Sequence, residues 1–411
     1  MWWEVMIMTF TLTYEFKLKP TAEQKEIFNE WLETNRQVYN YALGERKDWF
    51  KSRACDVTSC SIKSQYIIPA DTQRPTYNSQ AKALTDAKKQ YPHLKQVQSQ
   101  VLQQTLKRVE TAFTNMWERN FGFPRFKKRG RMRSFVFPQF KNNPVMGNKI
   151  KLPVIGVVGF RKSRPIPEDA KVKQVRIVKR VSGWYAMITL QWDVNVPQPM
   201  PHGNALGIDV GLTSMVAASN GLLIKRPRFF VDGSRKLKLL QQRVSRKRKG
   251  SNNWLRAQQK VAKLHEYVAN RRKDWHRKLS HQLCEGVGMI FVENLNLVGL
   301  SRGMLGKHCL DAGFGQFFNI LEQTCFKRGV YFQKVDPRKT SQICPNCLHE
   351  TGNKTLAERV HKCNNCGYIT DRDVAASQVV LIRGLAAVGH TVKMLSEGKN
   401  TSFPMTKESH G

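Results

Sequence analysis

The chain has 411 residues, of which 41% are hydrophobic and 10% aromatic, so it can form two or three domains with apolar cores and is not a disordered basic tail. Lys and Arg number 68 against 31 Asp and Glu, which gives a formal net charge of +37. No run approaches the roughly 18 apolar residues of a membrane span, and no amphipathic basic helix stands apart from a core, so we expect no membrane partner. A polyphosphate, above all nucleic acid, is the expected partner, and a merely basic protein is the weaker alternative.

The cysteines and the first residues indicate the compartment. Nine cysteines, four of them in one tight pattern, indicate metal ligation in a reducing environment and not a disulfide framework. The opening MWWEVMIMTF is apolar but short, and Glu4 stands where a secretion signal carries positive charge. We therefore expect a cytoplasmic protein.

The first half begins with a predicted strand and helix. In FTLTYEFKL, which starts at Phe10, every second residue is apolar, as is typical of a half-buried strand. Thr21 and Gln24 then form a capping box after Pro20 and open a helix. A polar stretch follows, over roughly residues 55 to 80. Helical spacing predicts that the next helix turns these residues toward a core: Leu102, Leu106, Val109, Phe113 and Met116.

A basic and aromatic segment, GFPRFKKRGRMRSFVFPQF, comes next. Its cations are Arg125, Lys127, Lys128, Arg129, Arg131 and Arg133. They are interleaved with Phe123, Phe126, Phe135 and Phe137. Cations contact phosphates while rings stack on bases or on the strand beneath, so the segment is a candidate nucleic-acid groove. The alternative is a solvated charged loop beside a core aromatic strand.

The sequence predicts β-structure from residue 150 to 192. Apolar residues alternate with polar ones on both sides of a turn at Ser182 and Gly183, which predicts a hairpin. The segment VPQPMPHG, residues 196–203, reads as a linker. We place the main domain boundary there.

Beyond the linker the pattern changes. LGIDVGLTSMVAASNGLLI predicts short strands with a turn at Asn220 and Gly221, and a helical hairpin follows it. The loop of this hairpin supplies further candidate nucleic-acid contacts, namely Arg246, Lys247, Arg248 and Lys249. The apolar run GMIFVENL is typical of a buried parallel strand, and residues 330–336 predict another. A last helix precedes a tail, after about Gly389, that we expect to remain unpacked.

The cysteine pattern predicts a structural metal site. Cys344, Cys347, Cys363 and Cys366 form two C-x2-C pairs separated by fifteen residues. Two such knuckles complete a tetrahedral shell that suits one Zn²⁺, without an open position for catalysis. Binding would contribute on the order of 10 kcal/mol of local folding energy. An iron–sulfur cluster is the alternative. The other cysteines are interpreted as small hydrophobic residues or inert thiols: Cys55, Cys60, Cys284, Cys309 and Cys325.

Several carboxylates stand where a lone negative charge is unfavourable. Asp209 lies within the apolar segment LGIDVGL, and Glu293 ends the buried run MIFVENL. They could meet Asp371 or Asp373 if the two strands are adjacent and the last helix packs over their ends. Three carboxylates this close raise one another's pKa unless cations bind. Two Mg²⁺ ions held there would support hydrolysis of a nucleic-acid backbone.

Each acid also has a simpler interpretation. Thr370 and Asp373 match a capping box, so Asp373 could merely begin the last helix. Asp209 could accept hydrogen bonds from backbone amides in a turn, and Glu293 could pair with an arginine. The three acids together, in this order and on these elements, favour the catalytic interpretation.

The chain resembles the TnpB (OrfB) proteins of insertion sequences, RNA-guided nucleases related to type V CRISPR effectors and commonly labelled transposases. The resemblance extends from about Thr11 to Gly384. It rests on KLKPTAEQ, NRQVYNYAL, GFPRFKKR, GIDVGL, LQQRVSRKRKGSNN, FVENLNL, TSQICPNC and CNNCGYITDRDVAAS. Three acidic motifs, with the cysteine pattern between the second and the third, make it specific.

This resemblance implies a multidomain α/β protein. Its nuclease domain would be RuvC-like, with an RNase H-like fold and an inserted four-cysteine zinc ribbon, and a wedge β-barrel with a helical insertion would precede it. The implied boundaries are 1–19 and 120–196 for the wedge-type β-barrel, 20–119 for the helical recognition insertion, 197–337 and 368–390 for the nuclease domain, 338–367 for the zinc ribbon and 391–411 for a flexible tail.

The resemblance also implies the chemistry. Asp209, Glu293 and Asp373 would be the catalytic ligands of two Mg²⁺ ions, with Asp373 preferred over Asp371 because the family's third acid closes the D-R-D triplet. The first half would hold a guide RNA from the transposon end and read a short motif flanking the DNA substrate. The implied function is RNA-guided DNA cleavage that supports transposition or maintenance of the element. A strand-transferring DNA transposase and a non-cleaving RNA-directed DNA-binding regulator are the alternatives.

Two positions depart from the family pattern. Leu348 follows Cys347 where the family usually has Gly, and we expect it to loosen that knuckle. Ala375 stands where the family commonly has Asn. The missing amide is expected to weaken the hydrogen bonding that positions Asp373.

Overall fold

The computed structural model describes residues 9–54, 68–69, 71–193, 198–355 and 357–389. The chain divides into two compact units, Met1–Val196 and Pro197–Gly411, and each is described by itself. Cys55, Cys60, the side chain of Phe10 and the tail expected beyond Gly389 lie outside the described residues. Most of the polar stretch over residues 55 to 80 does as well.

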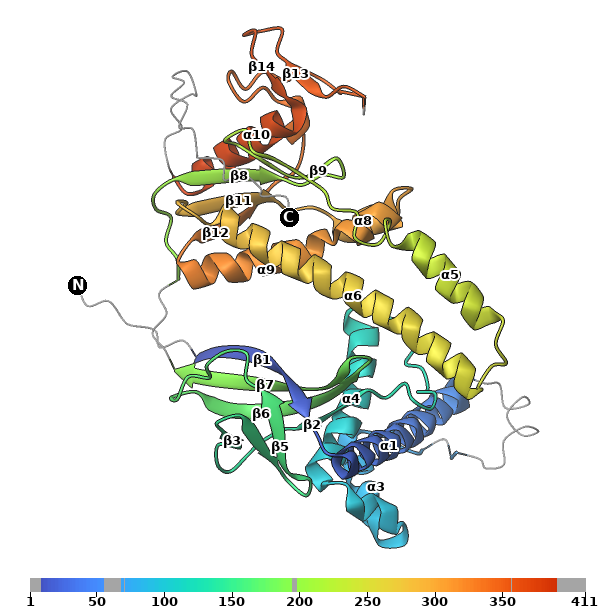
Figure 1. Cartoon of the computed structure of the whole chain (residues 1–411). Coiled ribbons are helices and arrows are strands. Elements are labelled where there is room, and N and C mark those ends of the chain that lie inside the picture. Colours follow the sequence, from blue (N-terminus) through green and yellow to red (C-terminus); the bar gives the residue numbers. More distant parts are fainter. Residues whose placement is uncertain (1–8, 55–67, 70, 194–197, 356, 390–411) are drawn as a thin grey trace. The chain divides into compact units, whose positions relative to one another are not determined.

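The first unit contains a seven-stranded antiparallel sheet in the order β2-β6-β7-β1-β5-β4-β3 (Figure 1). Its strands are β1 (Thr9–Lys19), β2 (Ser134–Phe137), β3 (Val145–Met146), β4 (Lys149–Leu152), β5 (Gly156–Arg161), β6 (Lys171–Arg180) and β7 (Gly183–Asp193). The alternation predicted for β1 is confirmed, since Phe16 and Leu18 are buried while Lys17 is exposed. The hairpin of β6 and β7 is confirmed as well.

Helices pack against this sheet. They are α1 (Ala22–Ala54), α3 (Tyr77–Gln90) and α4 (Ser99–Glu118), with a short 3-10 helix at Pro92–Gln96. The predicted capping box at the start of α1 is present, because Thr21 and Gln24 exchange two hydrogen bonds of 3.2 Å. The predicted core face of α4 is buried from Leu102 to Phe113.

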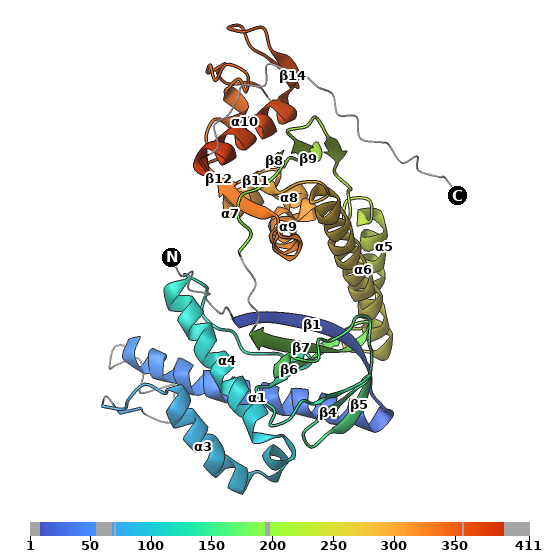
Figure 2. The ribbon, with the colours of Figure 1, turned by 90° about the vertical axis from the view of Figure 1, so that its left-hand side faces the viewer.

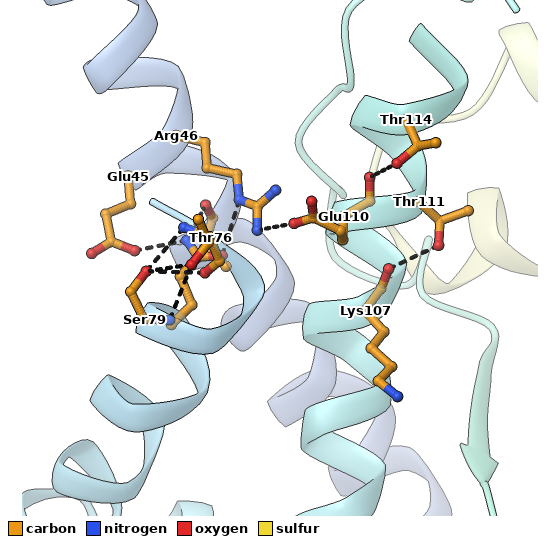
Figure 3. A network of polar contacts seen from close by, with 10 residues as sticks. Glu45, Arg46, Thr76, Ser79, Lys107, Glu110, Thr111 and Thr114 are labelled. Atoms are coloured by element: carbon orange, nitrogen blue, oxygen red, sulfur yellow. Dashed lines mark hydrogen bonds and ion pairs between the residues drawn. The ribbon is translucent and has the colours of Figure 1, made fainter. Parts of the chain in front are cut away.

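An ion pair between a buried arginine and a partly exposed glutamate joins the helices of the first unit (Figure 3). The guanidinium of Arg46 on α1 lies 2.5 Å from the Glu110 carboxylate on α4 and donates a hydrogen bond to Gln80 on α3. The Gln80 amide in turn donates to Glu45 and to the Ala42 carbonyl. Since the Arg46 side chain is fully buried, loss of Glu110 would leave its charge uncompensated.

The second unit is built on a five-stranded sheet in the order β10-β9-β8-β11-β12. Its strands are β8 (Ala205–Asp209), β9 (Ser214–Ala218), β10 (Leu223–Lys225), β11 (Met289–Glu293) and β12 (Tyr331–Val335). β11 runs parallel to both β8 and β12, whereas β9 runs antiparallel to β8 and β10. The predicted turn after β9 has Gly221 at a φ of +89°. The burial of all five residues of β11 and its parallel pairing confirm the predicted buried parallel strand.

Helices cover both faces of this sheet, as Figures 1 and 2 show. The helices of the unit are α5 (Ser234–Ser245), α6 (Asn252–Leu283), α7 (Leu297–Arg302), α8 (Gly306–Ala312), α9 (Phe314–Arg328) and α10 (Arg372–Ala387). Ile290 and Val292 of β11 pack into the core that α6 and α9 complete. Met289 and Phe291, on the opposite face, pack against α10.

A small two-stranded sheet of β13 (Val360–Lys362) and β14 (Ile369–Asp371) directly precedes α10. A 3-10 helix, η2 (Thr340–Gln342), lies between β12 and the first cysteine pair. Throughout the described part of the chain, every helix is too short or too polar to cross a bilayer.

Candidate active site and metal centre

The alternation of β8 and β11 directs two of the predicted acids to the same face of the sheet. Asp209 is the last residue of β8 and Glu293 the last of β11, and the neighbouring residues Ile208 and Val292 are paired in parallel register. Because Ile208 and Val292 face α9, the acids that follow them face α10. The two carboxyl groups lie close enough for each to affect the pKa of the other.

Asp373 reaches the same region from the first turn of α10. Asp371 caps this helix, and its Oδ1 accepts hydrogen bonds from the backbone N–H groups of Asp373 and Val374 at 2.8 and 3.3 Å. The capping box considered for Thr370 and Asp373 is therefore wrong. Since Asp371 performs the capping, the side chain of Asp373 is not needed to begin the helix.

The surroundings of the three acids disfavour their negative charge, which a bound cation would offset. Burial, followed by the negative charges of Glu293 and Asp373, raises the pKa of Asp209 well above its usual range. Burial also raises the pKa of Glu293 and of Asp373. Asp209 is half-buried and keeps some contact with solvent, but the protein atoms around it displace much of its water.

The simpler interpretations of these acids hold only in part. The backbone amide of Val210 lowers the pKa of Asp209, and the Thr340 hydroxyl and the charge of Arg383 lower that of Glu293. None of these offsets burial, because the pKa of each acid remains raised. Carboxylate oxygens are the donors that Mg²⁺ prefers, so the three side chains fit a divalent cation.

The three acids are less tightly gathered than the cysteines. Among the described residues, the cysteines at 344, 347, 363 and 366 are the one group of three or more candidate ligands whose donor atoms converge within 4.8 Å. Glu293 and Asp373 both act on Asp209 through their negative charge, with Glu293 the stronger of the two.

The two cysteine knuckles form a closed tetrathiolate site that fits a structural zinc ion. Sγ of Cys344 lies 3.6 Å from that of Cys366, and Sγ of Cys347 lies 3.6 Å from that of Cys363, so each contact joins the two pairs. Four thiolates at this spacing leave no position for substrate. Burial raises the pKa of the Cys344 thiol to about 12, so its deprotonation depends on a bound cation.

Two asparagines, which the sequence analysis did not single out, link the knuckles. Asn346 donates to Sγ of Cys366 and Asn365 donates to Sγ of Cys347, each at 3.6 Å. The Asn365 amide is the main cause that lowers the pKa of Cys347 to about 6. The amide of each knuckle thus stabilises a thiolate of the other.

The two knuckles have the same backbone turn, and this turn gives the physical reason why Leu348 is expected to loosen the first knuckle. The Leu348 N–H donates to the Cys344 carbonyl and the Gly367 N–H donates to the Cys363 carbonyl, both at 2.9 Å. Both residues have left-handed backbone conformations, with φ of +59° for Leu348 and +72° for Gly367. A leucine has a steric cost in this conformation that glycine does not. The first knuckle therefore carries strain that the second avoids.

The basic segment of residues 125–133 lies in the first unit and is held against α1. Asn40 of α1 accepts from the Lys127 N–H at 2.7 Å and donates to the Lys127 carbonyl at 2.9 Å. The ammonium of Lys127 lies over the Tyr39 ring. Apart from the half-buried Lys127, the predicted cations of this segment are exposed. Phe135 and Phe137 are buried in the core, so they do not stack on bases.

A cavity of about 400 Å³ adjoins this segment and is lined by parts of α1, α4, β2 and β6. Its cations include Lys107, Arg108, Lys127 and Arg176. Burial, followed by the charge of Arg176, lowers the pKa of Arg108, as expected where positive groups crowd together. The cations predicted at residues 246–249 are exposed between α5 and α6.

Three family models match parts of the chain. A family model described as a probable transposase matches residues 187–303, one described as a Cas12f1-like TNB domain matches residues 314–380, and one described as a helix-turn-helix domain matches residues 6–55. In the described part of residues 6–55, the chain forms β1 and the single helix α1.

Two relatives align with nearly the whole chain. It is 28% identical to the putative RNA-guided DNA endonuclease InsQ of Escherichia coli (strain K12), over 96% of each chain. It is 29% identical to a putative RNA-guided DNA endonuclease of Streptomyces pristinaespiralis, over 98% of this chain and 97% of the relative.

Among solved structures, a chain in the cryo-EM structure of a Cas12f1–sgRNA–target DNA complex matches with a TM-score of 0.54 and 13% identity, over 90% of this chain and 98% of the other. The fold is thus that of the Cas12 (type V) effectors. In sequence, the chain is similar to insertion-sequence proteins of the TnpB (OrfB) kind, through three family models and two relatives that align with nearly its whole length.

Proposed function

We propose that the protein is a transposon-encoded, RNA-guided DNA endonuclease with a two-metal, RuvC-type mechanism. The observation that carries the proposal is the placement of Asp209 and Glu293 at the ends of adjacent parallel strands, with Asp373 on the helix that packs over them. In this sheet β8, β10, β11 and β12 run in one direction and β9 runs in the opposite direction, as expected of an RNase H-like domain. The names of the full-length relatives support DNA as substrate and RNA as guide.

In this proposal the three acids share one task, which is to hold two Mg²⁺ ions. Bound there, the ions would activate a water molecule and stabilise the leaving oxygen of the phosphodiester. Asp209 and Glu293 present oxygens from the rigid ends of β8 and β11, so their separation is set by the sheet. Asp373 presents its oxygens from α10, whose start is fixed by the Asp371 cap.

The remaining parts would handle the nucleic acids. We assign residues 1–19 and 120–196 to a wedge-type domain, 20–119 to a recognition insertion, 197–337 and 368–390 to the nuclease domain and 338–367 to the zinc ribbon. The exposed cations of residues 125–133 and 246–249 would contact phosphates of the guide RNA and DNA.

The test begins with full-length protein expressed together with its flanking element, from which co-purified RNA is sequenced. One discrete RNA with a constant part, and Mg²⁺-dependent cleavage of matching DNA, is the expected result. Asp209→Asn should abolish cleavage and retain RNA. Asp274→Asn, an exposed surface acid of the same unit, is the control and should cleave normally.

Two results would overturn the proposal. Joining of element ends without RNA would instead support a strand-transferring transposase, the activity named in one of the matching family descriptions. Normal function of the Asp209→Asn variant would support a non-cleaving, RNA-directed DNA-binding regulator.

A further inference from the structure

A buried hydroxyl group holds one of the three acids. Oγ1 of Thr340 donates a hydrogen bond of 2.5 Å to Oε1 of Glu293. Thr340 is 6% exposed and Glu293 7% exposed, so water cannot readily replace either partner. The same hydroxyl lies 3.3 Å from the Pro337 carbonyl, a much longer contact for its single proton. The proton is therefore directed to the carboxylate.

The fold explains why Thr340 lies there. β12 runs beside β11 with Val335 paired to Glu293, and the Asn294 N–H donates to the Val335 carbonyl at 2.9 Å. The chain then reverses through Lys339, which has a φ of +57°, and enters η2 at Thr340. β12 ends beside Glu293, and this turn brings the Thr340 hydroxyl back to the Glu293 carboxylate.

Thr340 is also close in sequence to the metal centre. It precedes the zinc ligand Cys344 by four residues, and the Gln342 carbonyl between them accepts a hydrogen bond of 2.7 Å from the Thr351 N–H within the ribbon. The position of η2 is thus fixed on one side by β12 and on the other by the cysteine knuckles.

We propose that Thr340 is a positioning residue that sets the orientation of Glu293 for divalent-cation binding. This inference rests on the proposed function. A carboxylate has two oxygens, and a fixed hydrogen bond to one of them restricts rotation of the group, so the other oxygen is presented in one direction. Such partners of metal-ligating carboxylates typically change metal affinity or activity by about 10- to 100-fold when removed.

The test compares Thr340→Val, which keeps the shape of the side chain without its hydroxyl, with Thr340→Ser, which keeps the hydroxyl. Mn²⁺ binding to the full-length protein with its RNA is measured by electron paramagnetic resonance, and cleavage is titrated against Mg²⁺. We expect Thr340→Val to weaken Mn²⁺ binding by about tenfold and to raise the Mg²⁺ concentration that cleavage requires. Thr340→Ser should restore both to near the wild-type values.

Thr324→Val is the matched control. Thr324 is also 6% exposed and lies in the same unit, but its hydroxyl donates to the Ile320 carbonyl within α9. It should bind Mn²⁺ as the wild type does. Zinc content and melting temperature verify that each variant is folded, and Thr340→Ala replaces Thr340→Val if the valine variant is not.

The outcomes separate this inference from the function on which it rests. If Asp209→Asn abolishes cleavage and Mn²⁺ binding while Thr340→Val binds Mn²⁺ with wild-type affinity, only the role of Thr340 is refuted. Equal weakening by Thr340→Val and Thr340→Ser would also refute it, because the hydroxyl would not be the cause. If Asp209→Asn alters neither cleavage nor binding, the proposed function itself is refuted.

Discussion

Gly207 of β8 lies so close to Ser377 of α10 that a Cβ atom at position 207 would stand 2.1 Å from the Ser377 carbonyl oxygen. The glycine two residues before Asp209 is thus what allows α10 to rest directly on the sheet. This close approach also determines how near Asp373, one turn earlier in the helix, comes to the other two acids.

Gly207→Ala should therefore separate α10 from β8. Overpacking typically costs about 1–3 kcal/mol, and we expect the upper part of this range because the clash is with backbone atoms. Thermal unfolding measures the cost, and DNA cleavage should fall more steeply than stability explains. Gly303→Ala is the control, since its Cβ would meet nothing closer than 3.8 Å. Wild-type cleavage by Gly207→Ala would show that the spacing of α10 is not critical.

Leu348→Gly should stabilise the zinc ribbon. Removing the side chain relieves about 1–2 kcal/mol of left-handed strain, and the greater freedom of glycine in the unfolded chain offsets about 0.5–1 kcal/mol of it. The net gain should appear as slower zinc loss to a competing chelator. Gly367→Ala, at the equivalent position of the other knuckle, should have the opposite effect. Faster zinc loss from Leu348→Gly would mean that packing of the leucine outweighs its strain.

The metal-free protein should lose stability as pH rises. The pKa of Asp209, Glu293 and Asp373 is raised in the folded state, so between the ordinary carboxyl range and these raised values the folded state binds more protons than the unfolded state. Their contribution is fully present at low pH and is lost as pH rises through the folded-state pKa. Melting temperatures measured across pH with a chelator, and again with Mg²⁺, test this. Mg²⁺ should restore stability at neutral pH.

Asp209→Asn provides the matching variant for the pH experiment. It removes one of the mutually repelling charges, so it should melt at a higher temperature than the wild type in chelator at neutral pH, although we expect it not to cleave DNA. A lower melting temperature under these conditions would contradict the electrostatic account of the site.

Replacing Arg125, Lys128 and Arg129 with Ala should weaken RNA binding in a salt-dependent manner. Each lost phosphate contact reduces the slope of log affinity against log salt by about 0.7 to 0.9, so three contacts would reduce it by about 2 to 3. Lys89→Ala is the control, because Lys89 is paired with Asp86 on α3. An unchanged slope in the triple variant would remove this segment from the RNA-binding surface.

The sequence predicted well those features that depend on local pattern. Strand β11 follows from its continuous apolar run, and the start of α1 follows from Thr21 and Gln24. The turn containing Gly221 was equally visible. These features rest on periodicity or on side chains a few residues apart, which a single sequence displays directly.

Features that depend on distant contacts were missed or misplaced. Helix α3 was not predicted, and only Gln80 of its residues is fully buried, so its apolar pattern is weak. Thr340 begins the motif TSQICPNC, but its role was not predicted, since its partner Glu293 lies 47 residues earlier, on β11. Asp371, and not Thr370, caps α10, because β14 extends to Asp371 and the helix begins directly after it. The sequence alone did not reveal where this strand ends.

The order of the acids along the chain has a consequence for protein synthesis. Asp209 and Glu293 leave the ribosome first, but Asp373 follows only after the zinc ribbon, on the last helix described. Domains generally fold from the N-terminus as they emerge. Under the proposed function, a nascent chain would form its first unit well before the three acids can meet, and a product truncated before α10 would bind nucleic acid without cutting it.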